Sequence, residues 1–211
     1  EITEALKRAN TYESWMDELQ NDERQGVQKA FNQWKKRYEK QQKLMEEFNE
    51  KLQFDASFLP FKGAKLAGVD EAGRGPLAGP VVTAAVILPE DCEALIGVND
   101  SKQLSKSTRA KYAEIIKEHA LCYSIHFQSA EAIDELNILE ATKQSMKQSV
   151  ENLSVTPDFV IADAVLIPTA IPQKDIVKGD AKSLAIAAAS ILAKHERDLY
   201  MEKLHEEFPE Y

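Results

Sequence analysis

Four acidic residues stand where carboxylates from distant parts of the chain could work together. Asp70 closes the short apolar segment LAGV, and Glu71 follows it directly. Asp163 closes FVIA, and Asp180 lies between IVKG and a long alanine-rich segment. Strand ends in an α/β sheet are places where such side chains converge. Oxygen ligands, with no histidine or thiolate nearby in sequence, favour a hard divalent ion such as magnesium or manganese.

Each of these acids also has an ordinary structural role open to it. An acid at the end of an apolar strand costs desolvation free energy unless a partner compensates its charge. Asp70 could nevertheless be a simple turn residue, and Asp180 could cap the helix that follows, with Ser183 in its first turn. Three strand-end sites, with a doublet at one of them, strengthen the case for a metal site, but patterning alone leaves both interpretations open.

A glycine-rich segment with a single arginine follows the acid doublet. Gly73, Arg74 and Gly75 begin the stretch GRGPLAGP, which leads into a strand-like segment rather than a helix. The stretch therefore matches neither a P-loop nor a dinucleotide fingerprint. Its backbone can approach a ligand closely, and its N–H groups and arginine suit a phosphate or a sugar. A plain turn between two strands is an equally good interpretation.

Two further groups of residues could contact an anionic substrate. Ser101 and Lys102 precede a helical segment and could hold a phosphate, or they could simply belong to a solvated helix start. Lys194 and Arg197 are three residues apart, so they lie on one face of the last helix. They could balance the acidic cluster or pair with neighbouring acids on the surface.

The hydrophobic pattern predicts the elements that must position these groups. Their order is β-β-α-β-α-β-β-α, which indicates a mixed α/β core. Ser105 or Ser107 could cap the first core helix, and the alanine-rich half of the last helix would allow close approach to a sheet. The predicted strands are 65–70, 80–89, 121–128, 158–163 and 174–179, and the predicted helices are 104–120, 130–153 and 181–208.

Residues 1–60 are expected to form a helical N-terminal extension, and residues 61–211 the catalytic domain. The extension is rich in charged residues and nearly free of glycine and proline. Two helices are predicted, with a break near QNDERQG, where Asn21 or Asp22 could begin the second. The second helix could pack on the main body or act as an arm for substrate or a partner. Its interleaved charges favour neither.

Composition narrows the class of protein. The formal net charge of −9 argues against coating nucleic acid by bulk charge, but a local basic patch remains possible. No apolar run reaches the roughly 18 residues needed to span a bilayer, so no membrane partner is expected. Two cysteines, Cys92 and Cys122, suit a reducing cytoplasm. The chain starts without methionine and stops abruptly, so we expect a fragment, and nothing demands more than a monomer.

Four segments together resemble ribonuclease HII, the type 2 ribonuclease H of bacteria: GVDEAGRGPLAGPVVTAAVILP, DSKQLS, IADA and KGDAKSLAIAAASILAKHERD. The resemblance covers roughly residues 66–211. It implies a ribonuclease H-like mixed sheet flanked by helices. It also implies an endonuclease that uses two Mn²⁺ or Mg²⁺ ions to hydrolyse the RNA strand of RNA–DNA hybrids. Such an enzyme cuts 5′ to single ribonucleotides in duplex DNA, and so serves ribonucleotide and primer removal.

The resemblance also assigns roles to individual residues. The family's catalytic, metal-binding carboxylates fall on Asp70, Glu71, Asp163 and Asp180. The element that reads the 2′-hydroxyl falls on Gly73, Arg74 and Gly75. The element near the substrate backbone falls on Asp100, Ser101 and Lys102. The family continues into a glycine–tyrosine segment that this chain lacks, so it resembles a C-terminally truncated member, and Tyr211 is not given that tyrosine's role.

Two other classes of function compete with this one. A binding module with a degenerate site is compatible with the acidic charge, although all four acids are intact. A glycosidase would use paired carboxylates as acid and base. Adjacent side chains diverge on an extended strand, so Asp70 and Glu71 fit a glycosidase poorly.

Overall fold

The computed structural model describes residues 1–76, 78–99 and 101–209. Asp100 and Tyr211, which the sequence singled out, lie outside these residues. The chain divides into two compact units, 1–47 and 48–211, and each is considered by itself. No helix within the described ranges is both long enough and apolar enough to cross a membrane.

The N-terminal unit is helical and has its own aromatic core. It contains α1 (Ile2–Arg8), two 3₁₀ turns (Ser14–Met16 and Glu18–Asn21) and the first part of α2 (Gln25–Ala56). The Trp34 ring stacks on Phe31 and Tyr38, with centroids 5.8 and 5.1 Å away. Its Nε1 donates to the carbonyl of Ala9 at 2.9 Å, which ties α1 to α2. The second helix starts slightly later than predicted.

The larger unit contains a five-stranded mixed sheet in the order β3-β2-β1-β4-β5. Strands β1, β2 and β3 pair antiparallel, whereas β1, β4 and β5 pair parallel. The predicted mixed α/β architecture is thereby confirmed. The strands are β1 (Leu66–Ala72), β2 (Val81–Ile87), β3 (Cys122–Gln128), β4 (Phe159–Asp163) and β5 (Gln173–Ile176).

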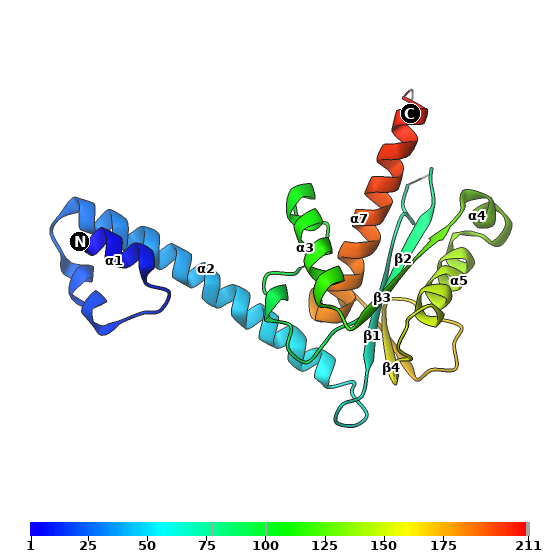
Figure 1. Cartoon of the computed structure of the whole chain (residues 1–211), viewed down its shortest axis with the longest axis horizontal. Helices are drawn as coiled ribbons and strands as arrows, with labels where there is room; N and C mark the ends of the chain where they lie inside the picture. Colours follow the sequence, from blue (N-terminus) through cyan, green and yellow to red (C-terminus); the bar gives the residue numbers. More distant parts are fainter. Residues whose placement is uncertain (77, 100, 210–211) are drawn as a thin grey trace. The chain divides into compact units, whose positions relative to one another are not determined.

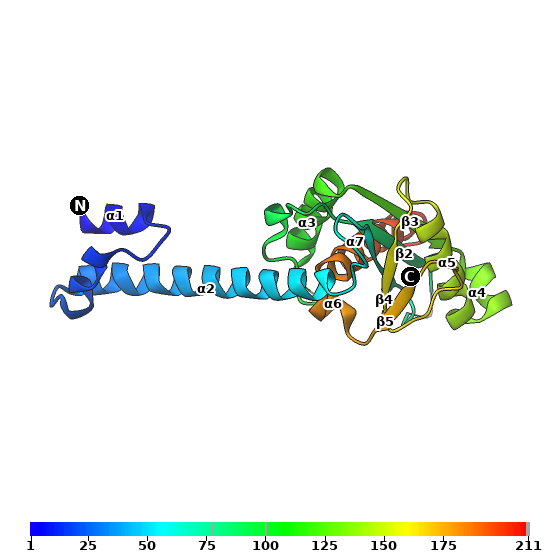
Figure 2. The same ribbon diagram turned by 90° about the horizontal axis from the view of Figure 1, so that it is seen from below.

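Helices cover both faces of this sheet (Figure 1). Helices α3 and α7 lie on one face, and α4 and α5 lie on the other, as the turned view also shows (Figure 2). The predicted cap of α3 is confirmed at Ser105, whose Oγ accepts the N–H of Thr108. The helix bounds are α3 (Lys106–His119), α4 (Ala130–Leu136), α5 (Ile138–Glu151), α6 (Gly179–Lys182) and α7 (Leu184–Glu207).

Two predicted helices are each interrupted. The segment 130–153 breaks at Asn137, whose φ of +70° is left-handed and whose side chain caps α5 by accepting the N–H groups of Leu139 and Glu140. Asparagine tolerates this conformation because its short polar side chain can bond locally. The last predicted helix breaks at Ser183, which has an extended backbone and caps α7 by accepting the N–H of Ile186.

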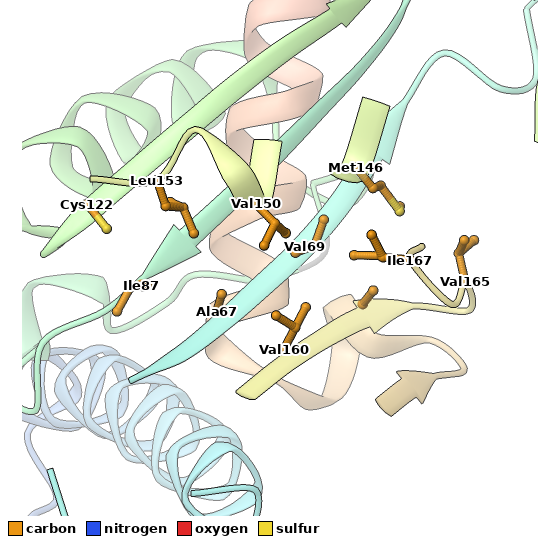
Figure 3. Packing of buried hydrophobic residues seen from close by; sticks show 12 residues of the cluster. Ala67, Val69, Ile87, Cys122, Met146, Val150, Leu153, Val160, Val165 and Ile167 are labelled. Atoms are coloured by element: carbon orange, nitrogen blue, oxygen red, sulfur yellow. The ribbon is translucent and has the colours of Figure 1, made fainter. Parts of the chain in front are cut away.

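The main core lies between the sheet and α5. Figure 3 shows Met146 and Val150 of α5 above Ala67, Val69 and strand β4. On the other face α7 approaches β1 directly, as its alanine-rich half predicted. A Cβ added to Gly68 would clash with the backbone of Ala185. The sheet therefore holds α7 at a fixed distance from β1.

Candidate active site

Strand pairing brings Asp70 and Asp163 together. Strands β1 and β4 are parallel, with Val69 opposite Ala162, so the next residue on each strand is an acid. Residues opposite each other in a sheet share a face. Asp163 ends β4 as predicted, but β1 continues to Ala72, so Asp70 does not end the strand and Glu71 lies within it. The prediction missed this because β2 keeps pairing with β1 beyond the apolar segment.

Helix α7 brings the Ser190 hydroxyl beside the Asp70 carboxylate, where it opposes the rise of the Asp70 pKa. Ser190 and Asp70 lie side by side because α7 packs directly against β1 at Gly68. From Gly68 to Asp70 the strand rises about 7 Å, and from Ala185 to Ser190 the helix rises about 7.5 Å. The backbone N–H of Glu71 also donates to Asp70 Oδ1, at 2.8 Å. The carboxylate is thus held from two sides, and Asp70 is only 5% exposed.

Burial and repulsion act together on the acid doublet. Burial, with the neighbouring charges of Glu71 and Asp163, raises the pKa of Asp70 well above its usual range. Burial also raises the pKa of Glu71, against the opposing effect of the nearby Arg74 guanidinium. Arg74 Nη1 lies 3.3 Å from Glu71 Oε1, while the buried Oε2 has no hydrogen-bond partner. The buried carboxylates in this cluster therefore carry more negative charge than the neighbouring Arg74 can balance.

Asp180 lies in the first turn of the short helix α6, beside Asp163. The backbone N–H of Gly179 donates to Asp163 Oδ1 at 2.7 Å, so Asp180 follows directly after a group that contacts Asp163. A Cβ on Gly179 would come within 2.6 Å of Ile186 Cδ1, so glycine permits this approach. Asp180 itself is 9% exposed. Ser183, rather than Asp180, caps α7.

The carboxylates suit a hard divalent cation in their chemistry. Within the described ranges, no three acidic, histidine or cysteine side chains are already arranged around a common metal position. The structure does place Asp70, Glu71 and Asp163 close enough to repel one another, and Glu71 Oε2 is buried without a partner. Oxygen donors of this kind, and the unmet negative charge, fit Mg²⁺ or Mn²⁺.

The glycine-rich segment lies beside the doublet and is anchored by a residue whose role the sequence did not reveal. Gly73 has a φ of +105°, and an added Cβ at Gly75 would meet open space. Arg197 of α7 donates to the carbonyls of Pro80 at 3.0 Å and Ala78 at 2.8 Å. Arg197 is only 6% exposed, so the prediction that it pairs with neighbouring acids on the surface is wrong. No local signal could reveal a contact made 117 residues away.

Lys194 does form the predicted surface ion pair, with Asp198 at 2.6 Å. Asp198 also holds Arg109, whose Nη2 lies 3.0 Å away. Arg109 Nη1 in turn donates to the carbonyl of Ser101 at 2.7 Å. Arg109 is another supporting residue that the sequence did not reveal, since its partners come from separate segments.

Ser101 and Lys102 point in different directions. The Ser101 side chain is 2% exposed, and its Oγ lies 2.9 Å from Ser190 Oγ. Lys102 is exposed. Ser190 therefore links the Ser101 segment to Asp70. A hollow of about 630 Å³ lies between the glycine-rich segment and the second half of α7, lined by Pro76, Ala78, Arg197, Asp198, Met201, Glu202 and His205.

Comparison with known proteins identifies the family. The sequence profile of Ribonuclease HII matches residues 67–211, and that of the Ribonuclease HII N-terminal domain matches residues 1–59. The chain is 49% identical over 193 residues to a ribonuclease HII of Bacillus cereus, an alignment that covers 92% of this chain and 75% of that protein.

Solved structures show the same fold. The crystal structure of ribonuclease H2 from Pyrococcus horikoshii OT3 matches with a TM-score of 0.63 and 31% identity, covering 68% of this chain and 77% of the other. Bst-RNase HIII in complex with Mn²⁺ matches with a TM-score of 0.57 and 23% identity, covering 68% and 55%, and supports the fold alone. The chain therefore belongs to the ribonuclease HII family, and is a metal-dependent endonuclease that cleaves RNA in RNA–DNA hybrids and serves ribonucleotide excision.

Proposed function

We propose that four carboxylates bind two divalent cations, Mn²⁺ or Mg²⁺, and form the catalytic centre: Asp70, Glu71, Asp163 and Asp180. The observation that carries this proposal is the group of buried acids at the β1–β4 junction, where Asp70 is 5% exposed and Glu71 Oε2 has no partner. Positive charge placed among them would relieve both the repulsion and the desolvation cost. Divalent cations at such a site activate a water molecule and neutralise charge on the leaving oxygen.

The surrounding residues have distinct proposed tasks. Ser190 and the Glu71 N–H orient the Asp70 carboxylate, and the Gly179 N–H orients that of Asp163. Held in this way, the carboxylates need little reorganisation, which is where preorganised sites gain their advantage. Arg74 stabilises the ionised form of Glu71 and could also contact a substrate phosphate.

The substrate is proposed to meet the protein along the glycine-rich segment. Gly73, Arg74 and Gly75 would read the 2′-hydroxyl of the ribonucleotide, since the open space at Gly75 lets the backbone approach a sugar. A site built to hydrogen-bond a hydroxyl strongly rejects an analogue that lacks it. Lys102 is exposed and suits a phosphate of the substrate backbone. The buried Ser101 hydroxyl suits support of its segment rather than direct contact.

The biological setting follows from this substrate class. We propose cleavage 5′ to single ribonucleotides within duplex DNA, by a monomer that works in the cytoplasm, where a bacterial chromosome lies. Residues 1–60 would form the N-terminal extension and 61–211 the catalytic domain. The matches of two separate family profiles, to residues 1–59 and 67–211, support this division.

A cleavage assay with parallel calorimetry tests the proposal. The substrates are a labelled DNA duplex with one ribonucleotide, a long RNA–DNA hybrid and an all-DNA duplex, each with Mn²⁺, Mg²⁺ or EDTA. We expect metal-dependent cutting 5′ to the ribonucleotide and an intact all-DNA duplex. Asp70→Asn should abolish cutting and reduce the heat of Mn²⁺ binding, whereas the exposed Asp134→Asn should change neither. Equal heats for wild type and Asp70→Asn would overturn the metal site.

A further inference from the structure

Arg197 is a buried arginine. Within the described part of the chain, all of its hydrogen bonds go to one loop, residues 73–80. It belongs to α7 and is 6% exposed. Its Nε donates to the Pro80 carbonyl at 3.0 Å, and its Nη2 donates to the Ala78 carbonyl at 2.8 Å. A guanidinium offers these donors in a rigid planar fork, so two carbonyls two residues apart are fixed with respect to α7.

The glycines at both ends of the loop are shaped around this side chain. A Cβ added to Gly73 would clash with Arg197 Nε and lie 2.5 Å from the Pro80 carbonyl. A Cβ on Gly79 would clash with the Met201 sulfur and lie 3.4 Å from Arg197 Nη2. Both glycines have left-handed φ values, +105° and +83°. The loop therefore packs directly against α7, and a side chain added at Gly73 or Gly79 would displace it from the helix.

The same helix holds the catalytic carboxylate. Ser190, which lies beside Asp70, precedes Arg197 by seven residues, which is two helical turns or about 10.5 Å. Residues seven apart lie on nearly the same side of a helix. One rigid element thus fixes both Asp70 and the loop that begins with Gly73.

We propose that Arg197 is a positioning residue that sets the distance between the 2′-hydroxyl-reading loop and the catalytic carboxylates. The proposal rests on the proposed function of Gly73, Arg74 and Gly75. Arg197 does not touch the reacting atoms. Its effect is to hold the backbone of the loop where the ribose of a correctly placed ribonucleotide can meet it.

The test compares Arg197→Lys, Arg197→Gln and, as a matched control, Lys203→Gln at an exposed cation on the same helix. Hydrogen exchange of the peptide 73–80 reports loop position without any need for activity. Steady-state cleavage of the single-ribonucleotide duplex gives kcat and KM. Calorimetry with Mn²⁺ reports the carboxylates, and thermal melting confirms folding.

We expect faster exchange of peptide 73–80 in both Arg197 variants and no change in Mn²⁺ affinity. Losing one charge-assisted hydrogen bond to the loop should lower kcat/KM by about tenfold to a hundredfold. Lysine should retain more activity than glutamine because it keeps the charge and one donor. Lys203→Gln should match the wild type throughout.

Three results would overturn the proposal. Unchanged exchange in folded Arg197 variants would show that the loop does not depend on Arg197. Wild-type kcat/KM would show that loop position does not matter. A parallel fall in Mn²⁺ affinity would show that Arg197 acts through the carboxylates. If the wild type fails to cut at ribonucleotides, the proposed function fails, while the exchange data still decide whether Arg197 holds the loop.

Discussion

Replacing Asp55 should remove a large part of the pH dependence of stability. Asp55 lies near the end of α2, in the larger unit, and its Oδ2 accepts the N–H of Ala185 at 2.9 Å, at the start of α7. Its other oxygen is buried without a hydrogen-bond partner. Burial raises the pKa of Asp55 to about 6, against the opposing effects of Ser183, the α7 backbone and Lys51.

Linkage between protonation and folding determines how Asp55 changes the free energy of unfolding with pH. A carboxyl whose folded pKa lies above its unfolded value of 3.8 favours the folded state most at low pH. Its contribution is full below about pH 4 and is lost as pH rises through 6. At about 1.36 kcal/mol for each pKa unit, the difference between 3.8 and about 6 is worth about 3 kcal/mol.

Urea unfolding from pH 4 to pH 7.5, on wild type and Asp55→Asn, measures this contribution. Asparagine keeps an oxygen for the Ala185 N–H and removes the charge. The difference between the two proteins should grow in favour of Asp55→Asn by about 2.4 kcal/mol from pH 4 to pH 7.5. Asp70 also has a raised pKa, but it is present in both proteins and cancels. Parallel stability curves would refute the reasoning.

Three more substitutions test individual contacts. Gly68→Ala should destabilise the protein by about 1–3 kcal/mol, because the new methyl group clashes with the Ala185 backbone; thermal melting measures this, and an unchanged melting temperature would contradict it. Ser190→Ala should lower kcat about tenfold to a hundredfold with the fold intact, since Asp70 loses a neighbouring hydroxyl worth about 1.5–3 kcal/mol; a cleavage assay, with circular dichroism to confirm folding, would measure this. Asn137→Ala should cost about 1–2 kcal/mol through loss of the α5 cap, and Asn137→Gly less, as denaturant titration would show.

Local patterns predicted most of the fold, because hydrophobic runs and helix caps depend on residues that are close together in the sequence. The five strands, their order along the chain and the Ser105 cap are examples. The break at Asn137 was missed because its apolar neighbours continue the helical period through it. Leu136 and Leu139, on either side of this break, are each 41% exposed.

The acids of the candidate site could be predicted because each lies at or just after the end of an apolar, strand-like segment. Asp70 and Asp163 lie side by side only because of the β1–β4 register, which no local pattern reveals. Ser190 and Arg197 looked like ordinary helix residues, since their partners are far along the chain. Supporting residues of this kind become visible only when the tertiary contacts are known.

The parallel β1–β4 pairing also sets the order in which the candidate site can assemble during synthesis. The two strands are separated by a long stretch of chain, as the 2.7 Å contact between Lys65 N and Asp158 Oδ2, 93 residues apart, illustrates. Such non-local contacts carry a high loop-closure entropy and form slowly. Asp70 and Glu71 are therefore synthesised well before Asp163 and Asp180, and Ser190 arrives only after all four acids. A polypeptide interrupted before α7 would carry all four acids but lack the helix that packs against β1.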